Sequence, residues 1–194
     1  MTIRILAVSG SSRRGSLNQK LLDVAARGAR AAGAAVTPVR LADYALPLYD
    51  GDLEADRGVP AAARLLQADF AAHDALLIAT PEYNGGYAAA LKNALDWVSR
   101  PRQDGTSGVA LLAGKAAALV SASPGQLGGL RSQLALRTVL DKLGVLVLPD
   151  AFALGLAHEA FDDAAELKDK AAEKAVLHVG AALCRTARRL AAGG

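Results

Sequence analysis

The sequence predicts an α/β protein in which a five-stranded parallel sheet is covered by helices on both faces. Short aliphatic runs alternate along the chain with longer segments of helical spacing. The composition is 52% hydrophobic but only 4% aromatic, which favours a core of Ala, Val and Leu between helices and a sheet. Parallel neighbours require crossover connections, and these are right-handed almost without exception. We therefore expect a doubly wound, three-layer sandwich.

The first half of the chain supplies three predicted strands and two predicted helices. An apolar run that ends at Gly10 forms the first strand, and Leu21, Leu22, Ala25 and Ala29 fall on one face of the helix after it. A turn-rich segment, residues 45–59, precedes the second helix. The expected strands are Ile3–Ser9, Val36–Leu41 and Ala75–Thr80, and the expected helices are Leu17–Ala32 and Ala61–Ala71.

The second half continues the alternation with two strands and three helices. Gly144 ends the middle helix, since glycine commonly follows a helix C-terminus. The expected strands are Ala116–Ser121 and Val145–Leu148, and the expected helices are Ala88–Val98, Leu130–Leu143 and Asp162–Leu190. No repeat, linker or low-complexity segment interrupts the pattern, so we expect residues 1–194 to form one domain.

Charge and rare residues argue against several classes of protein. The single cysteine, Cys184, and three histidines far apart in sequence argue against a protein metal site, so no metal ligand is assigned. The net charge is +3, but the basic residues are scattered and no reading motif accompanies them, which argues against nucleic-acid binding. The apolar run near the N-terminus is too short for a signal sequence or a membrane span. We expect a soluble, cytoplasmic protein.

The loop after the first strand has the composition of a phosphate site. It reads Ser9-Gly10-Ser11-Ser12-Arg13-Arg14-Gly15-Ser16-Leu17-Asn18. Glycines let backbone N–H groups turn inward, the next helix presents its free N–H groups, and an arginine neutralises the anion. The loop matches neither G-x-G-x-x-G nor a Walker loop, so a terminal monophosphate fits better. The alternative is that Ser16 only caps the helix and the arginines are solvated.

Two later loops have the composition of a shelf for a flat heterocycle. They are Pro81-Glu82-Tyr83-Asn84-Gly85-Gly86-Tyr87 and Ala122-Ser123-Pro124-Gly125-Gln126-Leu127-Gly128-Gly129. Proline stiffens a turn, glycine permits close approach, and an aromatic ring offers a stacking surface. Two doubly wound strand orders, 3-2-1-4-5-6 and 2-1-3-4-5, both place ligands at the carboxyl ends of the strands. The loops favour a flavin pocket there.

These loops resemble those of the NAD(P)H-dependent FMN reductases of flavodoxin-like fold, which include bacterial quinone, chromate and azo-dye reductases. Besides the first loop, the resemblance rests on Thr80-Pro81-Glu82-Tyr83-Asn84 with Leu91-Lys92-Asn93-Ala94-Leu95-Asp96-Trp97, and on Ser123-Pro124-Gly125-Gln126-Leu127-Gly128-Gly129-Leu130-Arg131. It covers roughly residues 3 to 148 and implies strand order 2-1-3-4-5. Gly86 departs from the serine or larger residue expected in the family.

The resemblance also implies which residues bind FMN. Those expected at the phosphate are Ser11, Arg13, Ser16, Leu17 and Asn18; those expected along the ring are Pro81, Glu82, Tyr83, Asn84 and Gly85; and those expected on its other side are Ser121, Ala122, Ser123 and Gly125.

The implied activity is oxidation of NADPH or NADH by a ping-pong mechanism, with quinones or azo, nitro or chromate compounds as acceptors. The flavin carries this chemistry, so no catalytic side chain is assigned. A carboxylate would oppose negative charge on a reduced flavin, so we expect Glu82 to fix its loop, with Arg131 as a candidate partner, or to form a subunit contact. The family also implies a homodimer or homotetramer, with Tyr83 near the interface. The alternative function is a flavodoxin-type FMN electron carrier that does not oxidise nicotinamide.

Overall fold

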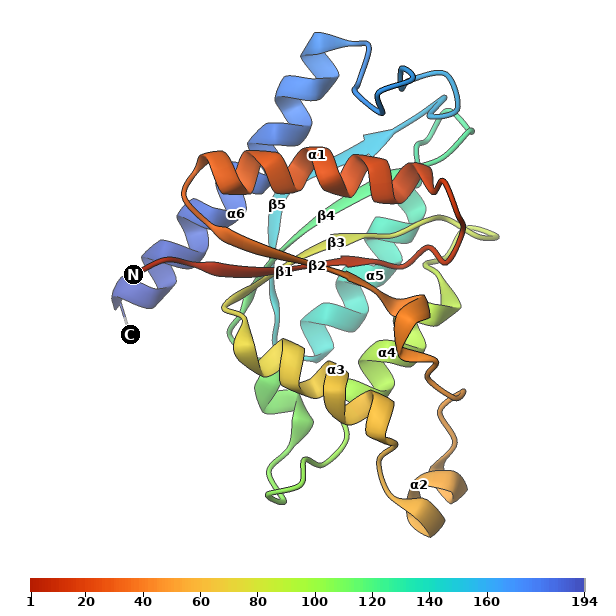
Figure 1. The fold of residues 1–194 in the computed structure, drawn as a ribbon, viewed down its shortest axis with the longest axis vertical. Helices are drawn as coiled ribbons and strands as arrows, with labels where there is room; N and C mark the ends of the chain where they lie inside the picture. Colours follow the sequence, from red (N-terminus) through yellow and green to blue (C-terminus); the bar gives the residue numbers. More distant parts are fainter. Residues whose placement is uncertain (194) are drawn as a thin grey trace.

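The strands form one parallel sheet in the order β2-β1-β3-β4-β5 (Figure 1). The computed structural model describes residues 1–193, so Gly194 of the predicted domain lies outside the described residues. The strands are β1 (Arg4–Ser9), β2 (Ala35–Arg40), β3 (Ala75–Ala79), β4 (Ala116–Ala122) and β5 (Leu146–Leu154). The predicted fold class is confirmed, and so is the 2-1-3-4-5 order.

Helices cover both faces of the sheet, as expected (Figure 1). One face packs against α1 (Leu17–Ala31) and α6 (Lys170–Gly193), and the other packs against α3 (Ala61–Ala72), α4 (Ala89–Val98) and α5 (Leu130–Lys142). Every residue of β3 and β4 is buried, because both strands lie inside the sheet with helices above and below. Pro38 lies in β2, an edge strand, where its missing N–H leaves no gap in the sheet.

Two glycines allow α1 and α6 to pack tightly against each other. A Cβ added at Gly28 would overlap the carbonyl of Leu177, and one added at Gly180 would overlap the carbonyl of Ala25. Both obstacles are backbone atoms in helices, which cannot move aside independently. Glycine is therefore required at both positions for the helices to pack at this distance.

The last strand was predicted too short. It continues through Pro149 and Asp150 to Leu154, whereas the sequence pattern ended it at Leu148. A register shift opposite Ala117–Leu119 of β4 accommodates the proline in a bulge, after which pairing resumes. Arg137 of α5 donates hydrogen bonds to the carbonyls of Val147 and Leu148 at this irregularity.

The last helix was predicted to begin too early. It begins at Lys170 rather than Asp162 because residues 162–168 fold into a turn. In that turn Asp162 N–H donates to the carbonyl of Glu166, and the amide of Lys168 donates to Ala160. The short helices α2 (Gly51–Arg57), η1 (Leu41–Tyr44) and η2 (Gly108–Leu111) were not predicted either. Helix α2 contains no buried residue and lies away from the sheet (Figure 1).

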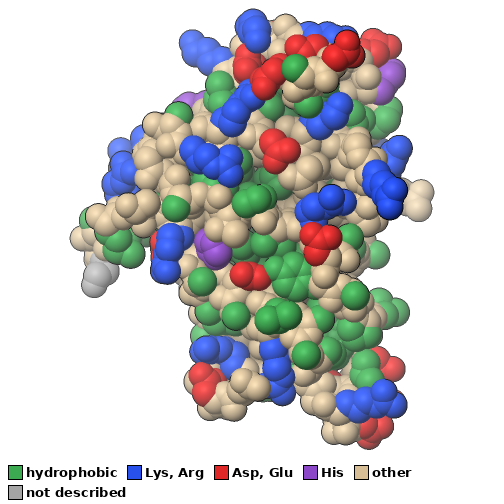
Figure 2. Space-filling model, in the orientation of Figure 1, with side chains coloured by type: hydrophobic (Ala, Val, Ile, Leu, Met, Phe, Trp, Pro, Cys, Tyr) green, Lys and Arg blue, Asp and Glu red, His purple; other side chains and the backbone are tan. Residues whose placement is uncertain are grey.

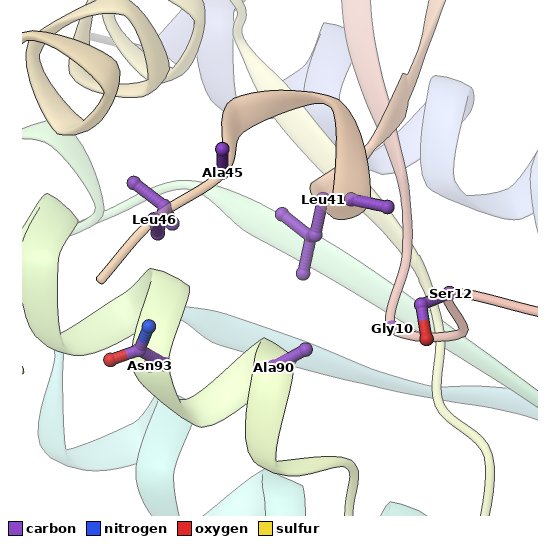
Figure 3. A pocket seen from close by; sticks show the side chains of 8 residues that line it. Gly10, Ser12, Leu41, Ala45, Leu46, Ala90 and Asn93 are labelled. Atoms are coloured by element: carbon purple, nitrogen blue, oxygen red, sulfur yellow. The ribbon is translucent and has the colours of Figure 1, made fainter. Parts of the chain in front are cut away.

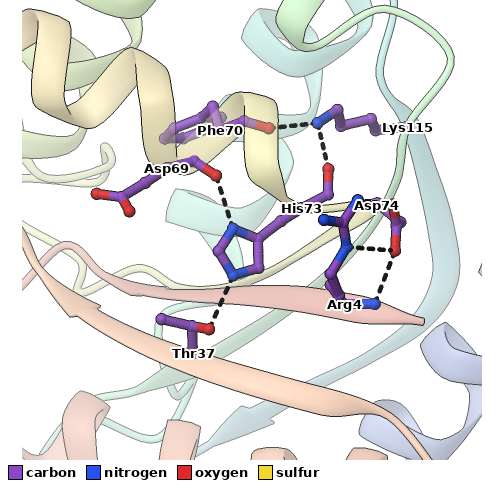
Figure 4. A network of polar contacts seen from close by, with 7 residues as sticks. All are labelled: Arg4, Thr37, Asp69, Phe70, His73, Asp74 and Lys115. Atoms are coloured by element: carbon purple, nitrogen blue, oxygen red, sulfur yellow. Dashed lines mark hydrogen bonds and ion pairs between the residues drawn. The ribbon is translucent and has the colours of Figure 1, made fainter. Parts of the chain in front are cut away.

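His73 is buried at the amino-terminal edge of the sheet (Figure 4). Its Nδ1 lies 2.6 Å from the carbonyl oxygen of Asp69 and its Nε2 lies 2.8 Å from Thr37 Oγ1. The Lys115 ammonium donates to the carbonyls of Phe70 and His73, and burial lowers the pKa of this lysine. These contacts satisfy the last carbonyls of α3 and fix the sheet edge opposite the glycine-rich loops.

Charged side chains of both signs are interspersed on the face of the molecule in Figure 2. None of the helices in residues 1–193 has the length and apolar character needed to cross a membrane. The same residues contain no group of three or more His, Cys, Asp or Glu side chains arranged to hold a metal ion.

Candidate functional site

A cleft at the carboxyl ends of β1, β3 and β4 brings the three predicted loops together. The strands are neighbours in the sheet, so loops more than 100 residues apart in sequence meet at one edge. The residues that line the cleft are Ser11, Arg13, Ser16, Leu17, Asn18, Pro81, Glu82, Tyr83, Ala122, Ser123 and Pro124.

The first loop leads into α1, and Ser16, Leu17 and Asn18 at the start of this capped helix line the cleft. Ser16 is the N-cap of α1, and its hydroxyl accepts a hydrogen bond from the amide of Gln19 at 3.2 Å. Ser16 also lines the cleft, so capping and ligand contact are compatible. Arg13 and Arg14 are both exposed, but only Arg13 lines the cleft. A guanidinium beside a helix N-terminus is a favourable environment for an anion.

Asn18 ties the first loop to the third. Its amide nitrogen donates to the carbonyl of Ala122 at 2.8 Å, and its amide oxygen accepts from the N–H of Ala122 at 3.0 Å. The side chain is buried, and both ends of its amide are engaged. The structure therefore gives Asn18 a positioning contact in addition to its place on the cleft wall.

The second loop is a tight turn that places Tyr83 in the wall of the cleft. The amides and carbonyls of Tyr83 and Gly86 exchange two hydrogen bonds of 3.0 Å, while Asn84 and Gly85 have φ angles of 52° and 80°. An Asn-Gly pair suits such a turn because both central residues need positive φ. Asn84 and Gly85, both predicted ring contacts, lie at its tip and do not line the cleft.

Glu82 forms the ion pair that was considered for it. Its Oε1 accepts hydrogen bonds from the guanidinium of Arg131, with Nε at 2.7 Å. The Glu82 side chain is only 7% exposed, whereas Arg131 on α5 is 60% exposed. The other carboxylate oxygen, Oε2, is buried and has no hydrogen-bond partner among the described residues. The pair fixes the second loop to α5 and leaves one acceptor unsatisfied at the cleft wall.

The third loop is held from behind by Ser121 rather than lined by it. Consecutive strand residues face opposite sides of a sheet, so Ala122 meets α1 while Ser121 meets α5. The Ser121 hydroxyl donates to the carbonyl of Gly128 at 2.7 Å and accepts from Gln133 Nε2 at 2.7 Å. Gly125, also a predicted contact, does not line the cleft; its amide donates to Ser123 Oγ at 3.2 Å.

Pro124, which lies within the predicted third loop, lines the cleft. Sequence reasoning missed Gln133 as a support of that loop, because Gln133 lies in a helix and carries no motif. Asn93 and Trp97 of α4 have structural roles. Both donate to the carbonyl of Pro47 at 2.8 Å.

Comparisons with known proteins show the family to which the chain belongs. The family model described as NADPH-dependent FMN reductase matches residues 3–159. A Pseudomonas aeruginosa protein named NAD(P)H-dependent FMN reductase is 39% identical over 97% of both chains. An Escherichia coli quinone reductase is 35% identical over 75% of this chain and 73% of its own. The solved structure of FerB, a flavoenzyme NAD(P)H:(acceptor) oxidoreductase from Paracoccus denitrificans, superposes with a TM-score of 0.80 at 29% identity, covering 97% of this chain and 98% of that one.

Proposed function

We propose, from the premise that this chain belongs to the NADPH-dependent FMN reductase family, that its cleft binds FMN and that quinones or similar small molecules are its electron acceptors. The chain is an oxidoreductase that uses FMN and NAD(P)H. What we propose is which residues bind FMN, which molecules accept the electrons, and in which order the two substrates react. We treat residues 1–194 as one FMN-binding domain.

The observation that carries the FMN assignment is the capped N-terminus of α1 with an unpaired arginine beside it. Ser11, Arg13 and Ser16 line this end of the cleft, and the first turn of a helix leaves backbone N–H groups without partners. Among the described residues, Arg13 forms no ion pair, so its charge is available to a phosphate. We propose that these residues and the N–H groups of Leu17 and Asn18 hold the phosphate.

The remaining walls suit the ring. Pro81, Glu82 and Tyr83 form one side, and Ala122, Ser123 and Pro124 form the other. We propose that Asn84, Gly85, Ser121 and Gly125 shape these two loops rather than contact the ring through their side chains. Bound FMN supplies the redox chemistry, since it accepts a hydride from the nicotinamide and passes electrons to the acceptor.

The protein's own contribution is then binding and electrostatics. Arg131 compensates the charge of Glu82, which reduces repulsion between this carboxylate and a ring that gains negative charge. No side chain of the cleft is required as an acid or base, so we assign no catalytic residue. One cleft serves nicotinamide and acceptor in turn, which predicts ping-pong kinetics.

We extend the proposal to the acceptor, the location and the assembly of the protein. Quinones lead the list because relatives are named quinone reductases, and azo, nitro and chromate compounds are further candidates. We propose a cytoplasmic homodimer or homotetramer. Exposed Tyr83, Leu127 and Leu134 support an interface near the cleft, since apolar side chains are favoured at the centre of such contacts.

A spectroscopic titration tests this function. We expect FMN to bind the purified protein, NADPH or NADH to bleach it under anaerobic conditions, and a quinone to restore the colour. Initial rates at varied NADPH and quinone should give parallel double-reciprocal lines. Bound FMN that no nicotinamide bleaches would favour the electron carrier, and failure to bind FMN would exclude both functions. Intersecting lines would exclude the ping-pong order.

A further inference from the structure

Glu82 carries a buried hydrogen-bond acceptor that no part of the described chain satisfies. Its side chain is 7% exposed, and its Oε2 is the one buried side-chain oxygen or nitrogen in residues 1–193 that has no hydrogen-bond partner. Buried polar atoms are nearly always paired, because burial removes their bonds to water. Glu82 lines the cleft, so an unpaired oxygen at this position indicates a ligand that supplies the missing donor.

The other polar side chains of this region differ from Glu82 in this respect. Asn93 lines the pocket across the first loop from the cleft (Figure 3), and its Oδ1 accepts from Tyr49 N–H at 2.7 Å while its Nδ2 donates to the carbonyl of Pro47 at 2.8 Å. In the cleft itself, both ends of the Asn18 amide are engaged. These amides hold the walls together, whereas the Glu82 carboxylate has capacity left for a ligand.

The ion pair with Arg131 fixes the carboxylate and decides which oxygen stays unpaired. Nε of Arg131 donates to Oε1 at 2.7 Å, and Nη2 of the same guanidinium donates to the same oxygen. A guanidinium that spanned both oxygens would have satisfied the whole carboxylate. Arg131 compensates the charge of Glu82 in any case, so the group that suits Oε2 is a neutral N–H or O–H rather than a second cation.

FMN offers one ring donor that matches this acceptor. Its phosphate is an anion, which a carboxylate would repel, and the phosphate is assigned to the other end of the cleft, at Arg13. The oxidised ring has a single N–H, at N3, between two carbonyl groups. Pro81, Glu82 and Tyr83 form the wall assigned to the ring, so N3–H is the donor that fits Oε2. Hydrogen bonds to ring nitrogens are also a means by which a protein tunes a flavin.

We propose that Glu82 Oε2 accepts a hydrogen bond from N3–H of the flavin ring, while Arg131 holds the carboxylate in place through Oε1. This inference rests on the proposed function. It makes Glu82 a cofactor-recognition residue in addition to a support of its loop, and it orients the flavin, with the phosphate at Arg13 and the N3 edge at Glu82. A hydrogen bond from a neutral donor to a charged acceptor contributes about 10–100-fold to affinity.

The test combines a flavin that lacks the donor with a protein that lacks the acceptor. The Kd values of FMN and N3-methyl-FMN are measured by quenching of flavin fluorescence for wild type, Glu82→Ala and Arg131→Lys. Wild type should bind N3-methyl-FMN about 10–100-fold more weakly than FMN, because the methyl group removes the donor. In Glu82→Ala the two Kd values should agree within about threefold, since the partner of N3–H is gone.

Arg131→Lys is the matched control for the ion pair. It keeps the positive charge but loses the two-donor geometry of the guanidinium, and it leaves the Glu82 carboxylate in place. The ratio of the two Kd values should therefore stay near the wild-type value in this variant, even if both flavins bind more weakly.

The ratio separates recognition of the ring from support of the loop. If Glu82 only fixes its loop, Glu82→Ala weakens both flavins alike and the ratio keeps its wild-type value, which would overturn the inference. Equal binding of both flavins by wild type would overturn it without any variant, so the test does not depend on the folding of Glu82→Ala. Failure of wild type to bind FMN at all would instead overturn the proposed function.

Ionisation of N3–H gives a second readout that does not depend on affinity. A carboxylate at hydrogen-bond distance opposes loss of this proton, so the pKa of N3–H in bound FMN should be higher in wild type than in Glu82→Gln, which has nearly the same shape without the charge. The pKa is read from the absorption spectrum of bound FMN as the pH is raised. Equal pKa values in the two proteins would place the carboxylate away from N3 and contradict the inference.

Discussion

Replacing Arg13 by Ala tests the phosphate assignment most directly. Arg13 lines the cleft beside the N-terminus of α1, while Arg14, the next residue, does not. Arg14 is therefore a matched control for Arg13, because both arginines are exposed and carry the same charge but only Arg13 lines the cleft. Arg13→Ala should weaken FMN binding, whereas Arg14→Ala should affect it only through long-range electrostatics.

The size of the effect follows from the contact that is lost. A hydrogen bond between charged groups contributes roughly 1.5–3 kcal/mol, and the exposure of Arg13 favours the lower end of this range. A loss of about 1.5–2 kcal/mol raises the Kd for FMN by about 10–30-fold. The helix N–H groups and hydroxyls remain, so binding is not abolished. For Arg14→Ala, screening over about 8 Å at physiological salt keeps the change below about threefold.

Titration of protein fluorescence with FMN and with riboflavin separates phosphate contacts from ring contacts. Riboflavin lacks the phosphate, so Arg13→Ala should leave its Kd unchanged within about twofold. Arg13→Ala should also reduce the salt dependence of FMN binding, because one ionic contact is gone. The reasoning is refuted if Arg13→Ala binds FMN as wild type does, or if it weakens riboflavin as much as FMN.

Three further predictions concern the scaffold around the cleft. Asn18→Ala leaves both backbone groups of Ala122 without partners and should lower the free energy of unfolding by about 2–4 kcal/mol, measured by urea denaturation. Gly28→Ala should lower it by more than about 3 kcal/mol because the helices must separate, while Gly51→Ala, with open space around it, should raise it by up to about 1 kcal/mol; equal effects would contradict the close α1–α6 packing. Burial opposes ionisation of Asp74, but hydrogen bonds from Arg4 outweigh it and lower the pKa of this carboxyl. The ionised Asp74 carboxylate therefore stabilises the fold above its ordinary pKa, and this stabilisation is lost as the pH falls through its pKa in the folded protein. The difference in free energy of unfolding between wild type and Asp74→Asn should shrink between about pH 5 and pH 2.

The sequence was most informative where the pattern of apolar residues alone determines the structure. Buried strands such as β3 consist of uninterrupted aliphatic residues, and the helices on either side carry an apolar face. Helix α2 has no such face, so it escaped prediction. Its N-cap is Asp50, whose carboxylate accepts hydrogen bonds from the amides of Asp52 and Leu53. Local capping, rather than burial, accounts for that helix.

The three loops named from the sequence meet in one cleft, but the sequence does not determine which way their individual side chains point. Ser121 and Ala122 are adjacent in sequence and were predicted to lie on the same side of the ring, yet they face opposite sides of the sheet. Which of two neighbours points toward a ligand depends on strand register, and no motif encodes it.

Besides the hydrogen bonds within each loop, bonds between different elements hold the cleft in shape. Asn18 connects the first loop to the third, Arg131 connects α5 to the second, and Gln133 connects α5 to the third through Ser121. Each of these side chains positions a loop through hydrogen bonds to atoms that need not contact the ligand. A screen for loss of FMN binding should therefore recover changes at Gln133 as well as at Arg13. The two classes differ in one respect: loss of Gln133 should weaken FMN and riboflavin alike, since it displaces a wall of the ring site, whereas loss of Arg13 should weaken FMN alone.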